Sequence, residues 1–242
     1  MHAATDSTIG PSLDRLEVYR QITQGTEEVL KFAINHSCQK FILISSGGVY
    51  GAQPSSMEKI SEDYLGIPDP LDPNSAYGIG KRAAEYLTSL YADEYGFDFV
   101  IARCFAFIGE DLPLDKHFAI GNFIRDALNN KDIIIKGDGS PIRSYMYQED
   151  LAYVLNLLIK NSYQIKTLNI GSDESYTLKE IASRIKKQCK KSINIKINGA
   201  RDGNIKNQYT PKVEKMVSIA GDYKFKNLNE SIENTLQRLV NP

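Results

Sequence analysis

Two short apolar runs constrain the fold of this chain more than any other feature. Lys40-Phe-Ile-Leu-Ile-Ser-Ser46 and Phe97-Asp-Phe-Val-Ile-Ala-Arg103 are almost continuously apolar rather than alternating. Such runs are typical of strands buried on both faces of a parallel sheet. Amphipathic helices are predicted at 13–35 and 76–95, so the order is helix, strand, helix, strand. This order predicts an α/β fold, a parallel sheet with helices on both faces.

The rest of the chain continues this alternation. Its 242 residues are enough for one large domain or two small ones. No shift in composition marks a linker, so a second domain would be built from interleaved segments. The further elements that we predict are helices near 117–130, 148–160, 177–189 and 228–239, and strands near 133–135, 143–147 and 167–170.

Composition and charge exclude several classes of protein. Apolar residues make up 42% and charged residues 24%, which is ordinary for a globular protein. Basic and acidic residues nearly balance, 29 against 30, whereas nucleic-acid binders usually carry a basic excess. There is no membrane-length apolar run, no signal-peptide pattern, no disulfide framework and no metal-ligand spacing. We therefore expect a reduced, cytoplasmic protein that binds no metal, nucleic acid or membrane.

The strongest local chemical signal opens the second predicted helix. Tyr77 and Lys81 are four residues apart and therefore share a helix face. An ammonium beside a phenol lowers the pKa of the tyrosine from about 10, which makes Tyr77 a candidate general acid and base. Ser46 ends the first apolar strand, at the sheet edge where α/β proteins bind ligands. The alternatives are an ordinary exposed helix face and a polar strand end.

Several ordered motifs resemble one enzyme family. Ser45-Ser-Gly-Gly-Val-Tyr-Gly51 and Ser75-Ala-Tyr-Gly-Ile-Gly-Lys81 are similar to extended short-chain dehydrogenases/reductases, in the branch of NAD-dependent nucleotide-sugar epimerases and dehydratases. The further segments that match in the same order are His2-Ala-Ala4, Gly25-Thr26, 103–109, 137–147 with 150–152, 169–172, and Tyr209-Thr-Pro with Lys215.

This resemblance implies a fold and a division into domains. The fold would be the C-terminal part of a Rossmann-type parallel sheet, with a small α+β substrate domain. Residues 1–107 and 144–172 would form a partial NAD-binding domain, and 108–143 with 173–242 the substrate-binding domain. The family's Gly-rich turn, which holds the cofactor pyrophosphate, has no counterpart in the sequence. On the resemblance, roughly 70–80 preceding residues are missing. We therefore expect that the chain is truncated at its N-terminus. One consequence would be that it has no activity on its own.

The resemblance also implies roles for individual residues. The catalytic residues would be Ser46, Tyr77 and Lys81, with Ser46 holding the sugar hydroxyl. Arg143 and Arg201 would bind the substrate diphosphate, because a guanidinium suits phosphate geometry. The alternative for each arginine, and for His117, is an ordinary surface side chain. NAD would be the cofactor, with NADP not excluded, and its contacts would be Ala3, Ala4, Ser45, Tyr77, Lys81 and Phe105. The substrate contacts would be Ser46, Arg143, Arg201 and His117.

The reaction implied is NAD-dependent epimerisation of a nucleoside-diphosphate sugar through a transient keto intermediate. Tyr77 would take a proton while hydride passes to the cofactor and later returns to the other face. Gly47-Gly48 stand where dehydratases of the family carry acidic residues, which favours an epimerase or reductase. The alternatives are a 4,6-dehydratase, an NADPH-dependent ketoreductase, and a non-catalytic sugar-nucleotide-binding fragment. The helices carrying Gly25 and Tyr77 would pair in a homodimer.

Overall fold

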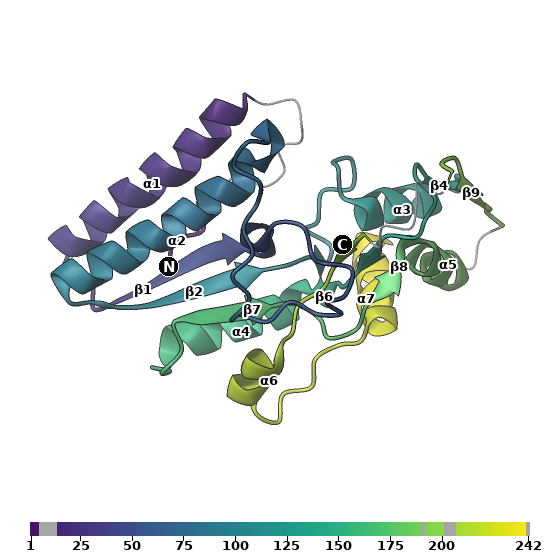
Figure 1. Cartoon of the computed structure of the whole chain (residues 1–242). Helices are drawn as coiled ribbons and strands as arrows, with labels where there is room; N and C mark the ends of the chain where they lie inside the picture. Colours follow the sequence, from purple (N-terminus) through teal and green to yellow (C-terminus); the bar gives the residue numbers. More distant parts are fainter. Residues whose placement is uncertain (5–13, 190–191, 201–206, 241–242) are drawn as a thin grey trace.

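The central sheet contains both apolar runs as neighbouring parallel strands. A computed structural model describes residues 1–4, 14–189, 192–200 and 207–240. The strand order is β1-β2-β7, parallel throughout, and His2 adds an isolated parallel bridge to Leu43 on the outer edge of β1 (Figure 1). The predicted strands are confirmed, with the bounds β1 Lys40–Ser46, β2 Asp98–Cys104 and β7 Thr167–Ile170.

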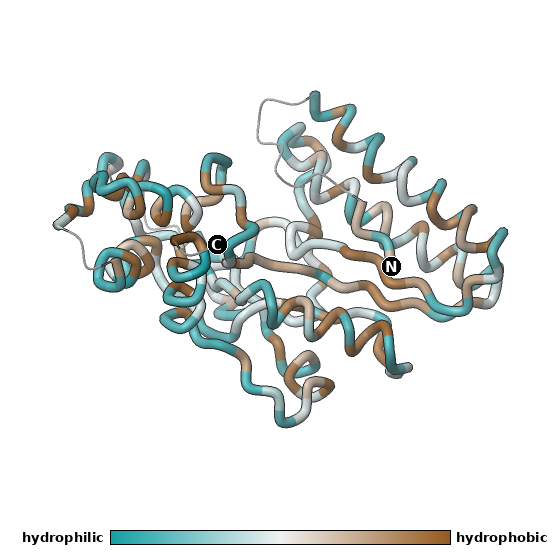
Figure 2. Tube along the Cα trace, turned by 180° about the vertical axis from the view of Figure 1, so that it is seen from behind, coloured by the Kyte–Doolittle hydropathy of each residue, from teal (hydrophilic) through white to brown (hydrophobic). Residues whose placement is uncertain are grey.

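Helices cover both faces of this sheet (Figure 1). Phe41 and Leu43 of β1 pack in one apolar cluster with α1 and α2. Ile42 points to the other face, into a cluster with α4 and α6 that includes Val154. Figure 2 shows the apolar strands running between the helical layers. The predicted α/β class is therefore confirmed, with the bounds α1 Arg15–Asn35, α2 Ala76–Tyr95, α4 Gln148–Lys160 and α6 Glu214–Ala220.

A separate apolar core lies beyond the carboxyl end of the sheet. Ile124, Ile181 and Ile232 are fully buried there, each from a different helix. The division into a cofactor-binding and a substrate-binding domain stays a prediction. The elements around this core are α3 Ala119–Leu128, α5 Leu178–Cys189 and α7 Leu228–Val240, with the parallel pair β4 Ile133–Ile135 and β9 Ile195–Ile197.

The strand predicted at 143–147 is wrong as a single element. The chain divides at Ser144-Tyr145 into two strands that join different sheets, so one half pairs with β8 and β10 and the other with β3. Two-residue strands have no periodicity, and the sequence therefore gave no signal for them or for α6. The short elements are β3 Phe107–Ile108, β5 Ile142–Arg143, β6 Met146–Tyr147, β8 Tyr176–Thr177, β10 Gln208–Tyr209, and the 3₁₀ turns η1 Gly47–Tyr50 and η2 Pro73–Ser75.

Candidate functional site

Ser46, Tyr77 and Lys81 come together at the carboxyl end of β1. Ser46 is the last residue of the strand, and its Oγ accepts a hydrogen bond of 3.1 Å from Gly48 N at the start of η1. Tyr77 lies in the first turn of α2, and its phenol interacts with the Ser46 hydroxyl. Lys81 follows one turn later, with Nζ 6.0 Å from the centre of the Tyr77 ring. The helix spacing thus places Tyr77 and Lys81 on one face of α2, at the strand end that carries Ser46, as predicted.

Lys81 is an unusually buried ammonium. Its Nζ donates a 2.9 Å hydrogen bond to the carbonyl oxygen of Ile44, and the residue is only 4% exposed. Burial lowers the pKa of Lys81 to about 8, against the opposing influence of Cys104 and Glu85. Lys81 is therefore a hydrogen-bond donor at the carboxyl end of the sheet. Its charge can change at a pH only slightly above neutral.

The expected lowering of the Tyr77 pKa is not met in this structure. Burial raises the pKa of Tyr77, and the hydrogen-bonding interaction with Ser46 opposes that rise only in part. Lys81 donates a hydrogen bond to the Ile44 carbonyl, whereas its spacing from Tyr77 predicts an ammonium beside the phenol. Tyr77 is therefore a protonated phenol in the site as described.

A second phenol, which sequence reasoning missed, also reaches Ser46. Tyr209 interacts with the Ser46 hydroxyl, and its ring centre lies 4.6 Å from that of Phe105. Burial is the main cause that raises the pKa of Tyr209. Because the parallel pairing of β10 with β5 sets Tyr209 opposite Arg143, only the tertiary fold brings this residue to the site. No spacing in the sequence carries that information.

Arg143 is a partly buried cation beside this cluster. Its guanidinium donates 2.8 Å to the Ile142 carbonyl and 2.9 Å to Asn207 Oδ1. Burial lowers the pKa of Arg143. No carboxylate within the described ranges forms an ion pair with this guanidinium, and a cation without one suits an anionic ligand.

The residues predicted to contact the cofactor lie in different environments. Phe105 is 8% exposed, and its ring packs at a tilt against that of Tyr209, which interacts with Ser46. The Ser45 hydroxyl instead donates 2.6 Å to Glu85, so this side chain is engaged in the interior. Ala3 and Ala4 are exposed and follow His2 at the outer edge of β1. Their roles in cofactor binding stay predictions.

Two predicted substrate contacts lie outside this cluster or outside the described residues. His117 is exposed, and its ring packs 4.2 Å from that of Phe118. No hydrogen bond among the described residues joins it to Ser46. Arg201 falls in the segment 201–206, which lies outside the described residues. The roles of His117 and Arg201 in substrate binding stay predictions.

A buried polar network supports the site from beneath. Glu85, two turns after Tyr77, accepts hydrogen bonds of 2.9 and 2.7 Å from Arg103 on β2. Arg103 Nη1 also donates 2.8 Å to the Tyr50 hydroxyl, which in turn donates 2.8 Å to Asn169 on β7. These polar groups, almost excluded from water, lock α2 to all three strands. The network fixes the helix that carries Tyr77 and Lys81.

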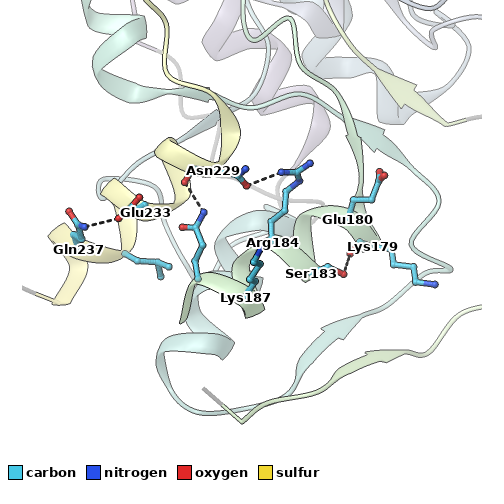
Figure 3. Close-up of a pocket in the computed structure, with 10 residues that line it drawn as sticks. Lys179, Glu180, Ser183, Arg184, Lys187, Asn229, Glu233 and Gln237 are labelled. Carbon is cyan, nitrogen blue, oxygen red and sulfur yellow. Dashed lines mark hydrogen bonds between the residues drawn. The ribbon is translucent and has the colours of Figure 1, made fainter. Parts of the chain in front are cut away.

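An open groove of about 880 Å³ lies elsewhere, between α5 and α7 (Figure 3). Lys179, Arg184 and Lys187 line it together with Glu180 and Glu233, so its charges are mixed. Arg184 is already occupied by a 2.8 Å hydrogen bond to Asn229. None of the predicted site residues lines this groove.

A comparison with family models decides the family. The model described as "NAD dependent epimerase/dehydratase family" matches residues 1–171. The chain belongs to this family. The Ser46–Tyr77–Lys81 cluster at the end of β1 lies within the matched region. NAD is the cofactor that the family name carries.

Two of the curated proteins that the chain resembles are UDP-glucuronic acid decarboxylases. UDP-glucuronic acid decarboxylase 1 from Danio rerio is 32% identical over 147 residues, which cover 61% of this chain and 34% of that protein. UDP-glucuronic acid decarboxylase 1 from Arabidopsis thaliana is 32% identical over 165 residues, covering 67% and 37%. The chain thus spans well under half of these relatives' own length.

Solved structures show the same fold. UDP-glucuronic acid 4-epimerase from Bacillus cereus, in complex with NAD, has a TM-score of 0.79 at 25% identity, covering 96% of this chain and 71% of that one. UDP-glucose 4-epimerase from Thermotoga maritima has a TM-score of 0.84 at 22% identity, covering 98% and 75%. No helix in the described parts of the chain has the length and apolarity to cross a membrane.

Proposed function

We propose that this chain carries the substrate side of an NAD-dependent 4-epimerase acting on a UDP-sugar through a transient 4-keto intermediate. The observation that carries the proposal is the cluster of Ser46, Tyr77 and Lys81 at the carboxyl end of β1. Membership of the NAD dependent epimerase/dehydratase family supports the redox chemistry. The Bacillus cereus neighbour, a UDP-glucuronic acid 4-epimerase, supports carbon 4 and the UDP group.

The residues of the chain fit the nicotinamide half of the cofactor. The buried Lys81 ammonium is a donor suited to ribose hydroxyls, and Phe105 offers an aromatic face beside Ser46. Bound NAD would supply the acceptor and donor of hydride. Arg143 would hold the diphosphate, since it is a partly buried cation without a carboxylate among its described partners.

Ser46 and Tyr77 would handle the proton. Ser46 would hold the sugar hydroxyl, and Tyr77 would take its proton when hydride leaves carbon 4 and return it when hydride comes back. Tyr77 must first release its own proton, and the interaction with Ser46 is the one that lowers its pKa. The sugar keeps all its oxygens in this scheme, and the cofactor is regenerated.

The test is product analysis with UDP-glucose and NAD⁺. We expect UDP-galactose, with a rate lowered at least about 100-fold by Tyr77→Phe, the usual size of a lost general acid and base. Tyr95→Phe is the matched control, because Tyr95 lies at the far end of the same helix and is 52% exposed. Turnover unchanged by Tyr77→Phe would contradict the proposal. A folded chain that binds UDP-glucose without turnover would favour the non-catalytic alternative.

Decarboxylation is the second candidate, because the curated relatives are UDP-glucuronic acid decarboxylases. A carboxylate on carbon 5 leaves readily only when carbon 4 is a ketone, since the electron pair is then held as an enolate. The first oxidation is therefore common to both candidates. Release of CO₂ from UDP-glucuronic acid would favour this reading. Loss of water would instead indicate the 4,6-dehydratase, and stoichiometric NADPH consumption the ketoreductase.

We also propose a homodimer formed by α1 and α2, and a cytoplasmic location supported by three free cysteines. Large apolar side chains are exposed on these helices, among them Leu16 at 51%, Tyr86 at 66% and Leu90 at 47%. A pair of such faces would bury them in a helix bundle. Light scattering should give twice the chain mass, and Leu90→Lys should give the monomer. A monomeric wild type would contradict the dimer.

A further inference from the structure

The two glycines after Ser46 lie directly beneath two phenols. A Cβ at position 47 would lie 2.6 Å from the Tyr209 hydroxyl and 2.8 Å from the Phe105 ring. A Cβ at position 48 would lie 3.7 Å from the Tyr77 ring. The first distances are too short for any side chain, so the Tyr209 hydroxyl fills the space that residue 47 would otherwise occupy.

Tyr209 reaches this place on a fixed backbone. Its neighbour Gln208 is buried and donates 2.9 Å to the Pro54 carbonyl. On the other side, Thr210 N donates 2.9 Å to Gln53 Oε1, and Ile60 N donates 2.9 Å to the Thr210 carbonyl. Hydrogen bonds on both sides therefore tie β10 to the loop that follows η1. The phenol is positioned by the fold rather than by a flexible segment.

Counting donors around Ser46 shows that one phenol proton is left over. The Ser46 hydroxyl can donate one hydrogen bond and accept two, and Gly48 N already supplies one of the two. Tyr77 and Tyr209 both interact with it and both are protonated phenols, because burial raises the pKa of each. If one phenol donates to Ser46 and the other accepts from it, the second keeps a free O–H. That O–H is then available to an oxygen of a bound ligand.

We propose that the Tyr209 hydroxyl is a second hydrogen-bond donor to the sugar oxygen on the reacting carbon, standing where a side chain of residue 47 would be. The inference rests on the proposed function, and it deepens that function. Two tyrosines and a serine would surround the oxygen. No carboxylate in the described ranges hydrogen-bonds to Ser46, Tyr77 or Tyr209. Such a site holds the substrate oxygen while it becomes the keto oxygen during hydride transfer, and it offers no carboxylate to assist loss of water from a neighbouring carbon of the sugar.

The test removes one oxygen from the protein and one from the ligand. Tyr209→Phe keeps the ring on Phe105 and deletes only the hydroxyl. Tyr64→Phe is the control, because it removes the hydroxyl of another tyrosine in a neighbouring loop, where its ring stacks 6.1 Å from Tyr50. The probes are UDP-glucose and UDP-4-deoxyglucose, titrated by calorimetry in the presence of NAD⁺. Thermal unfolding shows that each variant is folded.

We expect Tyr209→Phe to weaken binding of UDP-glucose about tenfold, the effect of one lost hydrogen bond, and to leave binding of UDP-4-deoxyglucose within about twofold. Tyr64→Phe should change neither. If wild type discriminates between the two probes and Tyr209→Phe discriminates equally well, the inference is overturned while the proposed function stands. If the folded wild type binds neither probe, the proposed function itself fails and takes the inference with it.

Discussion

The buried pair of Arg103 and Glu85 offers a quantitative test of how the site is held. The two side chains are 8% and 5% exposed, and Arg103 donates two hydrogen bonds to Glu85 and a third to Tyr50. Arg103→Met removes all three donors. Within the described part of the chain, Glu85 then keeps a 2.6 Å hydrogen bond from Ser45 and a 3.5 Å ion pair with Arg82. The variant therefore leaves a carboxylate charge buried and poorly compensated.

Breaking a buried pair from one side costs about 3–5 kcal/mol of unfolding free energy. The matched control is Lys166→Met, which breaks the pair with Asp98 whose side chains are 61% and 39% exposed. Exposed pairs contribute about 1 kcal/mol or less. The same substitution should therefore cost several times more at position 103 than at position 166.

The assay is urea unfolding followed by circular dichroism, since the chain has no tryptophan. Adding Glu85→Leu to Arg103→Met removes the orphaned charge and should recover at least about 1–2 kcal/mol. Equal costs at positions 103 and 166, or strictly additive costs in the double variant, would refute the account of a buried network that fixes α2.

Two further outcomes follow from the same geometry. Gly47→Ala should lower the unfolding free energy by about 1–3 kcal/mol because its Cβ meets Tyr209 and Phe105, whereas Gly25→Ala, in open space on α1, should raise it by about 0.5–1 kcal/mol. Equal urea midpoints would contradict this. Between about pH 7 and 9.5 the unfolding free energy should rise by about 2 kcal/mol, because the pKa of Lys81 is lowered from 10.5 to about 8 and the unfolded chain binds more protons there. The Lys81→Met variant should not show this rise in unfolding free energy. If the rise persists in the variant, its assignment to Lys81 is refuted.

The sequence predicts the longer strands and helices, whose side chains follow a regular pattern of burial. The apolar runs at 40–46 and 97–103 became neighbouring strands, because continuous burial on two faces leaves a plain signal. The four-residue spacing of Tyr77 and Lys81 placed both on one helix face at the site. The strand at 143–147 divided because its residues serve two different sheets. Local pattern carries no information on such a change of partner.

The parts of the site that escaped prediction depend on contacts between distant segments. Glu85 shares the face of Tyr77 and Lys81, yet nothing in its spacing says that Arg103 on β2 lies opposite. Tyr209 was matched only as part of a motif, and its hydroxyl reaches Ser46 through the pairing of β10 with β5. Gly47 was interpreted as a missing acidic group. The structure instead shows a phenol in the space above it.

Deuterium at sugar carbon 4 gives the most direct test of the central claim, that Ser46 and Tyr77 serve a reversible hydride transfer. The chain is incubated with UDP-[4-²H]glucose and NAD⁺ in ordinary water, and the epimer is examined by mass spectrometry and proton NMR. The account predicts an inverted product that keeps its deuterium, because the hydride leaves and returns without exchange with solvent. Solvent hydrogen at carbon 4 of the epimer, or no inversion by folded, substrate-bound chain, would contradict it.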